Sequence, residues 1–268
     1  MPAQDDLPAF GALIIGDEIL SGRRADKHLA KLIELLGERG LALSWARYLG
    51  DDPARITREL REAFASGDVV FSFGGIGATP DDHTRQCAAA ALGVELQLHP
   101  EARVLIEQRL AEMAAEKSEP LDMQHPDNLR RLDMGRFPAG ARIIPNPYNR
   151  IPGFSVARVH FVPGFPVMAW PMVASVLDTE YAALRGRRAW LERALLVFGS
   201  MEATLTPLME AVQARYPGVA VFSLPSVDHP QHGRHIELGV KGEPAATEAA
   251  FAWMRSELEA MGVSVRTE

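Results

Sequence analysis

The first 93 residues repeat one pattern three times: an apolar segment, an acidic turn and an amphipathic segment. The apolar run Ala12–Ile15 is typical of a strand that is covered on both faces. Strands are predicted at residues 10–15, 42–48 and 69–73. Helices, which carry apolar residues at intervals of three and four, are predicted at residues 26–39, 53–64 and 82–92. This alternation indicates an α/β fold with a doubly wound, mostly parallel sheet.

The pattern continues less regularly to residue 184. A helix is predicted at 100–116, followed by a polar loop at 117–128 that contains two prolines. Two extended segments near 141–145 and 155–162 come next, separated by turns rich in glycine and proline. A helix near 167–184 completes the layer.

Composition changes at the basic joint Arg185–Arg188, and a second pattern follows it. Strands are predicted at residues 194–198, 219–224, 235–241 and 263–266. Helices are predicted at residues 204–216 and 245–261. The order βαββαβ is that of a ferredoxin-like domain. We therefore expect a larger α/β domain over residues 1–186 and a smaller one over residues 187–268.

Composition narrows the class of protein. The 268 residues include 28 Lys and Arg against 35 Asp and Glu, which gives a net charge of −7 and argues against nucleic acid as the main partner. The single cysteine, Cys87, allows no internal disulfide and is expected to be a buried small apolar residue. A reducing, cytoplasmic location is expected, with no membrane partner, since three prolines interrupt the uncharged stretch 161–177.

Acidic pairs follow each of the first three predicted strands, in the turns 16–18, 50–52 and 74–82. Since parallel strands present their carboxyl ends at one edge, these carboxylates should gather there, where ligands bind. Mg²⁺ or another divalent cation, held partly through phosphate oxygens, would neutralise them. Other roles remain open: Asp52 as a helix cap, Asp81 and Asp82 at a helix start, and Asp17 and Glu18 paired with Arg23 and Arg24.

The turn Gly74–Asp82 is rich in glycine and lies between a buried strand and a helix. Without β-carbons, its backbone N–H groups can approach an anion, and the helix N-terminus adds partial positive charge. The turn has neither the Walker A pattern nor the dinucleotide-binding fingerprint, so neither NAD nor flavin is expected. Thr79 could give its hydroxyl to a phosphate or cap the helix.

Several motifs resemble one known family. Gly16–Gly22 (GDEILSG) and Gly74–Thr84 (GGIGATPDDHT) are similar to signatures of the molybdopterin-binding (MoCF-biosynthesis) domain, and above all to the amino-terminal region of CinA, the competence/damage-inducible protein A. Gly50–Ile56, Pro145–Phe154 and Val162–Ala169 extend the resemblance over roughly residues 8–185. The CinA amidohydrolase domain is expected to be absent, because the chain ends at Glu268.

The resemblance implies a site for a phosphorylated pterin or nucleotide over the glycine-rich turn. Asp81 and Asp82 are the catalytic candidates, and Asp17, Glu18, Asp81 and Asp82 are the metal candidates. The candidates for contact with the ligand and its phosphate are Gly16, Gly74, Gly75, Gly77, Thr79, Thr84, Asn146, Gly153 and Gly164. Binding alone, metal-dependent hydrolysis of an ADP-ribose-type pyrophosphate and a non-catalytic regulatory role all fit. Family members often self-associate, so a homo-oligomer is also compatible.

Departures from the family pattern affect hydrolysis more than binding. Ala78 replaces a proline, His28 an asparagine and Met168 a glutamate, and Asn149 stands where a glycine is usual. Arg150 could meet a phosphate or form a surface ion pair. The remaining candidates are His83, for ligand contact, and His229, His232 and His235, which could bind a metal but are more typical of a solvated hairpin.

Overall fold

The computed structural model describes residues 8–186 and 191–267. The chain divides into two compact units, Met1–Arg185 and Gly186–Glu268. Each unit has its own sheet and its own hydrophobic core.

A six-stranded mixed sheet forms the centre of the first unit, in the order β2-β1-β3-β8-β7-β6. Pairing is parallel from β2 to β8 and antiparallel from β8 to β6. The bounds are β1 Phe10–Ile15, β2 Leu43–Leu49, β3 Val69–Phe73, β6 Arg142–Ile144, β7 Gly153–Val156 and β8 Val159–Val162. All the residues of β1, β3 and β8 are buried, as expected for strands covered on both faces.

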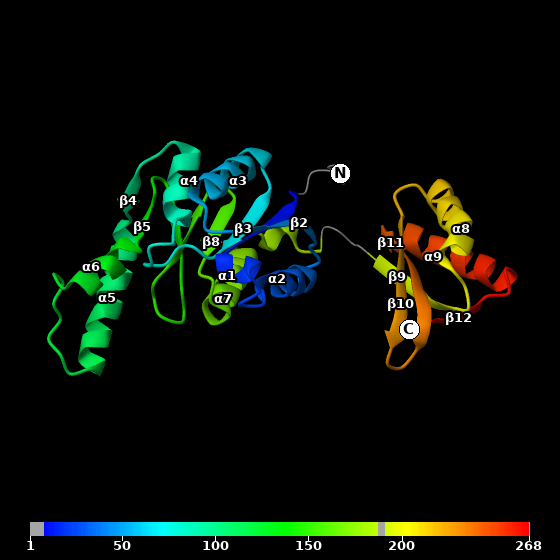
Figure 1. The fold of residues 1–268 in the computed structure, drawn as a ribbon. Coiled ribbons are helices and arrows are strands. Elements are labelled where there is room, and N and C mark those ends of the chain that lie inside the picture. Colours follow the sequence, from blue (N-terminus) through cyan, green and yellow to red (C-terminus); the bar gives the residue numbers. More distant parts are fainter. Residues whose placement is uncertain (1–7, 187–190, 268) are drawn as a thin grey trace. The chain divides into compact units, whose positions relative to one another are not determined.

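Helices cover both faces of this sheet, which confirms the predicted α/β class (Figure 1). On one face α2 (His28–Gly37) and α7 (Pro166–Thr179) pack against β1 and β3. On the other face lie α3 (Pro53–Ser66) and α4 (Thr84–Leu92). Here Asp52 caps α3 by accepting from the Arg55 N–H at 2.7 Å, as predicted.

A separate group of elements extends from the sheet and consists of α5 (Pro100–Glu116), α6 (Pro126–Asp133) and the two-stranded sheet of β4 (Leu96–Leu98) and β5 (Arg136–Pro138). Figure 1 shows α5 and α6 side by side at the far end of this unit. The apolar pattern of the chain predicts none of β4, β5 and α6. The predicted loop 117–128 is wrong at its end, because α6 begins at Pro126.

Three further boundaries differ from the predictions. The helix predicted over 26–39 begins at His28, where the Asp26 carboxylate accepts from the N–H groups of His28 and Leu29. The segment 155–162 is a hairpin, because the chain reverses between β7 and β8 with Ala157 at φ +50°. The helix predicted near 167–184 ends at Thr179, and a short 3₁₀ turn follows at Ala182–Leu184.

The second unit has the ferredoxin-like order that the sequence predicts. Its elements are β9 Leu191–Phe198, α8 Glu202–Arg215, β10 Ala220–His229, β11 Gly233–Gly242, α9 Pro244–Ala260 and β12 Ser264–Thr267. The strands pair in the order β10-β11-β9-β12, all antiparallel, and the helices bury Leu205, Leu208 and Met254 against them. No helix among the described residues combines the length and apolarity needed to cross a bilayer.

A buried polar chain joins three elements of the first unit. The ring of His160 on β8 is fully buried; its Nδ1 lies 2.7 Å from Ser155 Oγ on β7, and its Nε2 lies 2.7 Å from the Tyr181 hydroxyl after α7. Burial, with a smaller effect from the positive charge of Arg142, lowers the pKa of His160 to about 3. The imidazole is therefore neutral in the folded protein and contributes stability as a hydrogen-bonding bridge.

This pKa makes folding depend on pH. Above the ordinary histidine pKa of 6.5 the ring is neutral in both states, whereas at lower pH only the unfolded chain takes up the proton. Between pH 6.5 and 4.5 this uptake should cost about 2 kcal/mol of unfolding free energy. His160→Phe should lower stability at pH 7 but lose that part of the pH dependence, as measured by urea unfolding at each pH. An unchanged slope would contradict the assignment.

Candidate functional site

Four parallel strands deliver the candidate turns to one edge of the sheet. Hydrogen bonds join these turns to neighbouring strand ends: Gly16 N–H donates to Leu49 O at 3.0 Å, and Gly74 N–H donates to Val162 O at 3.1 Å. The turns after β1, β2, β3 and β8 are therefore held together at this edge. Gly164, after β8, lies so near Gly74 that a β-carbon on it would be 3.5 Å from the Gly74 Cα.

Residues 74–82, here called the glycine loop, depend on glycine for their backbone path. Gly74 and Gly75 have φ of +95° and +69°, which residues with a β-carbon rarely adopt. A β-carbon on Gly74 would collide with the carbonyl oxygen of Ile15, and one on Gly75 with the hydroxyl of Thr84. These glycines are therefore needed for close packing within the protein, whether or not a ligand binds.

The glycines of the three acidic turns share a second feature. A β-carbon would collide with a carboxylate oxygen at each of them: Glu18 at Gly16, Asp17 at Gly50 and Asp82 at Gly77. Each glycine thus leaves room for an acidic side chain that folds back over the backbone. In the first and third turns the acid belongs to the same turn as its glycine, whereas Gly50 of the second turn leaves room for Asp17 of the first.

Two threonines hold the glycine loop in shape. Thr84 is fully buried; its N–H donates to Gly75 O at 2.9 Å and its hydroxyl to Gly74 O at 3.2 Å. In this structure Thr84 positions the loop, with its hydroxyl engaged inside the protein, and its contact with a phosphate stays a prediction. Thr79 donates its N–H, at 2.9 Å, and its hydroxyl to the Asp82 carboxylate.

The helix that was predicted to start at residue 82 starts two residues later. The helix α4 begins at Thr84 with His83 at its N-cap position, so Asp81 and Asp82 lie in the glycine loop and not in the first turn of the helix. The Asp82 carboxylate closes the loop on Thr79 and leaves the helix end open. Asp81 is exposed at the surface.

Four consecutive backbone N–H groups of the glycine loop, those of residues 75–78, donate to none of the residues that the structure describes. Backbone donors are almost always paired in proteins, with solvent or a ligand where the protein offers no acceptor. Successive free N–H groups beside a helix N-terminus form an anion-binding concavity. These four N–H groups are therefore available to solvent or to a ligand with an acceptor.

The carboxylates of the first two turns engage one another's backbone. Asp17 N–H donates to Asp51 Oδ2 at 2.9 Å, and Asp51 N–H donates to Asp17 Oδ1 at 3.2 Å. Partial burial, together with the negative charges of Asp17, Glu18 and Asp81, raises the pKa of Asp51. Sequence reasoning placed Asp51 at this edge but did not select it as a site residue.

No ion pair joins Asp17 or Glu18 to any described arginine. The pairing with Arg23 and Arg24 that the sequence left open is therefore not formed.

A ready-made metal centre is absent from the described part of the chain: no three His, Cys, Asp or Glu side chains there are placed to hold an ion. Asp17, Glu18, Asp81 and Asp82 therefore do not converge as a ligand set. Mg²⁺ commonly takes only one or two carboxylates from the protein and the rest from phosphate and water. The exposed Asp81 and the charged pair Asp17 and Asp51 fit that mode of binding.

The loop between β6 and β7 is held by its own polar side chains. Asn146 is buried; its Nδ2 donates to Asn149 Oδ1 at 2.8 Å and to Ile151 O at 2.9 Å, and its Oδ1 accepts from Tyr148 N–H at 3.0 Å. A β-carbon on Gly153 would collide with the backbone of β8. Asn146 and Gly153 thus support this loop, and their direct contact with a ligand stays a prediction.

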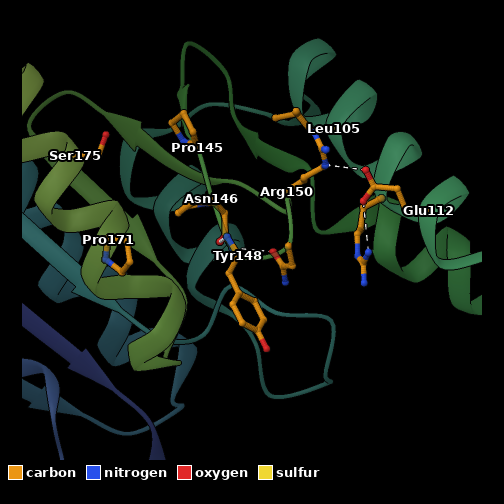
Figure 2. A pocket seen from close by; sticks show the side chains of 11 residues that line it. Leu105, Glu112, Pro145, Asn146, Tyr148, Arg150, Pro171 and Ser175 are labelled. Carbon is orange, nitrogen blue, oxygen red and sulfur yellow. Dashed lines mark hydrogen bonds and ion pairs between the residues drawn. The ribbon is translucent and has the colours of Figure 1, made fainter. Parts of the chain in front are cut away.

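A cavity of about 650 Å³ lies between this loop, α5 and α7. Figure 2 shows Pro171 and Ser175 of α7 on one side of the loop and Leu105 and Glu112 of α5 on the other. Arg150, with φ +63°, extends to Glu112, and Nε lies 2.9 Å from the carboxylate. Arg150 therefore forms the surface ion pair that the sequence left as one of two alternatives.

His28, which replaces an asparagine in the family pattern, contacts both β3 and the turn after β8. Its ring stacks on Phe73 with centroids 4.6 Å apart, and its Nε2 lies 3.1 Å from Gly164 O, which accepts the hydrogen bond. Burial lowers the pKa of His28. His28 thus fixes the turn after β8 beside the glycine loop.

The other candidates lie outside this arrangement. Cys87 is buried in α4, as predicted. His229, His232 and His235 have mutual ring-centroid distances of 4.8–5.8 Å on the β10–β11 hairpin, but they are not placed to hold a metal.

The sequence matches the family described as a probable molybdopterin binding domain over residues 11–183. The chain belongs to this family. The match covers the β1–β3 turns, the glycine loop and the turn after β8, and it ends before the second unit begins. The molybdopterin-binding family thus accounts for the whole of the candidate site.

Relatives extend the match toward the second unit. A CinA-like protein of Citrifermentans bemidjiense is 34% identical over 204 residues, which are 74% of this chain and 46% of that protein. A CinA-like protein of an Anaeromyxobacter species is 30% identical over 270 residues, covering 94% of this chain and 63% of that protein. The chain thus spans about half the length of the curated relatives it matches.

A solved structure, described as the protein CinA with unknown function from Thermoplasma acidophilum, matches with a TM-score of 0.53 and 25% identity. The match covers 63% of this chain and 97% of that one. It supports the molybdopterin-binding fold of the first unit.

The raised pKa of Asp51 generates a test of the acidic edge. Because the folded state disfavours its ionised form, Asp51 costs stability at neutral pH, and the cost disappears when it is protonated below its ordinary pKa of 3.8. Asp51→Asn keeps an acceptor for Asp17 N–H and should raise stability at pH 7 by a few tenths of a kcal/mol, with a smaller gain at pH 3.5.

Thermal unfolding at the two pH values measures this difference. Asp52→Asn is the matched control, since asparagine also caps helices and no such gain is expected there. A gain at Asp51 that is equal at both pH values would show that charge is not its cause.

Proposed function

We propose that this chain binds a phosphorylated pterin or nucleotide, with the phosphate on the glycine loop. The observation that carries the proposal is the row of four N–H groups, residues 75–78, that have no acceptor among the described residues. The family match supports a pterin-type ligand, because the family is described by molybdopterin binding. The phosphate would take the N–H groups that the loop leaves free.

One exposed aromatic side chain adjoins the turn beside the glycine loop, a second lies on the β6–β7 loop, and both favour a ligand with a flat ring. Phe165 is 55% exposed and directly follows Gly164, which contacts the glycine loop. Tyr148 is 62% exposed on the loop that lines the cavity (Figure 2). Exposed rings of this size offer stacking surfaces to a pterin or purine.

A divalent cation would complete the site once phosphate is present. Asp81, together with Asp17 or Asp51, would supply the protein's carboxylate oxygens, and phosphate oxygens and water would supply the rest. When bound, the cation would neutralise the phosphate charge beside these carboxylates. The proposal therefore includes cation binding that depends on the ligand.

Hydrolysis of a pyrophosphate is not the function proposed here. Met168 stands where the family pattern has a glutamate, and its sulfur accepts a hydrogen bond from Asn149 Nδ2 at 3.5 Å. That position therefore supports the β6–β7 loop and offers no carboxylate. Release of AMP from ADP-ribose by the purified protein with Mg²⁺ would favour the hydrolase instead.

Gly75→Ala tests the glycine loop directly. The added methyl group would collide with the Thr84 hydroxyl and place alanine at φ +69°, so the N–H row should be displaced. ADP affinity in the presence of Mg²⁺, measured by calorimetry, should fall by about tenfold or more, which corresponds to about 1.4 kcal/mol.

Gly140→Ala is the matched control, because Gly140 has φ +83° but nothing lies within 4 Å of an added β-carbon. It should bind ADP like the wild type. Near-ultraviolet circular dichroism checks that both variants are folded. Equal ADP affinity in the two variants, or no ADP binding by the wild type, would refute the proposed site.

Asp81→Asn tests the cation. Because Asp81 is exposed, its loss should leave stability unchanged and reduce the gain in ADP affinity on adding Mg²⁺ by about threefold, the effect of a partly solvated charge. Glu101→Gln, in the first turn of α5, removes the same charge elsewhere. Equal Mg²⁺ effects in the two variants would exclude Asp81 from cation binding.

A further inference from the structure

Arg85 is a buried cation directly behind the glycine loop. It is 5% exposed, and its guanidinium contacts only backbone carbonyls: one Nη donates to Gly77 O at 2.7 Å and the other to Asp133 O. Its Nε–H has no acceptor. No carboxylate of the described residues pairs with it.

The nearest carboxylates are engaged elsewhere. Asp82 and Asp133 both lie close enough to favour the charged form of Arg85. However, Asp82 accepts from Thr79, and the Asp133 carboxylate pairs with Arg136 Nε at 2.9 Å. The positive charge of Arg85 is therefore not neutralised by a direct partner.

The position of Arg85 is unfavourable in two other respects. Burial disfavours its charged form and lowers its pKa, yet an arginine remains protonated in proteins. It is also the second residue of α4, where the helix dipole favours an anion and not a cation. An anion bound close to this end of α4 would relieve both unfavourable effects.

We propose that Arg85 is the fixed positive charge of the phosphate site, acting from behind the glycine loop through its bond to Gly77. It is a positioning residue: it holds the Gly77 carbonyl away from the ligand side, so that the neighbouring N–H groups face the phosphate. Its charge also attracts phosphate electrostatically. This inference rests on the proposed function and adds the source of its selectivity for phosphorylated ligands.

The negative charge of the edge favours a role for such a residue. The turns around the glycine loop carry Asp17, Glu18, Asp51, Asp81 and Asp82, and the loop itself has no lysine or arginine. A phosphate arriving without a cation would meet net negative charge. A buried charge is screened by salt much less than a surface charge, so Arg85 attracts phosphate over a wide range of ionic strength.

The experiment uses the full chain in EDTA, so that no cation contributes. Affinities for adenosine, AMP and ADP are measured by calorimetry for the wild type, Arg85→Met and Arg85→Lys. Arg85→Met should leave adenosine affinity within about twofold and lower ADP affinity by about tenfold, with AMP between them, because the loss scales with phosphate charge. Arg85→Lys should recover most of the ADP affinity.

Arg103→Met, an exposed position on α5 that pairs with Glu107, controls for the change in net charge and should bind ADP like the wild type. Equal loss of adenosine and ADP affinity in Arg85→Met would assign Arg85 a purely structural role and overturn the inference. So would unchanged ADP affinity, or an Arg85→Lys variant that is folded but no better than Arg85→Met. A wild type that binds neither AMP nor ADP, even with Mg²⁺, would overturn the proposed function as well.

Discussion

The candidate site depends on the close approach of backbones at the carboxyl ends of β1, β3 and β8. A β-carbon on Gly74 would collide with the Ile15 carbonyl, and one on Gly164 would be in van der Waals contact with Gly74. Because the strands beneath are fully buried, this edge rests on a rigid base. Thr84 and Arg85 then fix the glycine loop from the α4 side, and His28 fixes the turn after β8.

The polar groups at this edge are of two kinds. Groups that shape the loops, such as Thr84 and Asn146, are buried and satisfied within the protein. The N–H groups of residues 75–78 and the carboxylate of Asp81 remain available to a ligand. These free groups are preorganised, since they lie on a backbone that other contacts already hold.

The sequence predicts the strands and most helices of both units, because their apolar residues follow clear periods. It fails for β4 and β5, which are three residues each and too short to show a period, and for the hairpin hidden in residues 155–162. The position of the site at the strand ends follows from topology. The partners of each carboxylate and the isolation of Arg85 do not, because they depend on residues from distant parts of the chain, such as Asp133.

The pairing of glycines with carboxylates in the acidic turns has a consequence for the evolution of this edge. At Gly16, Gly50 and Gly77 a carboxylate oxygen occupies the space of the missing side chain. Replacing one of these glycines would force the acid outward, whereas replacing the acid by a smaller residue would leave a hole above the glycine. Residues in contact are energetically coupled in this way, so their effects do not add. Each glycine and its acid should therefore change together in related sequences, as one unit of substitution.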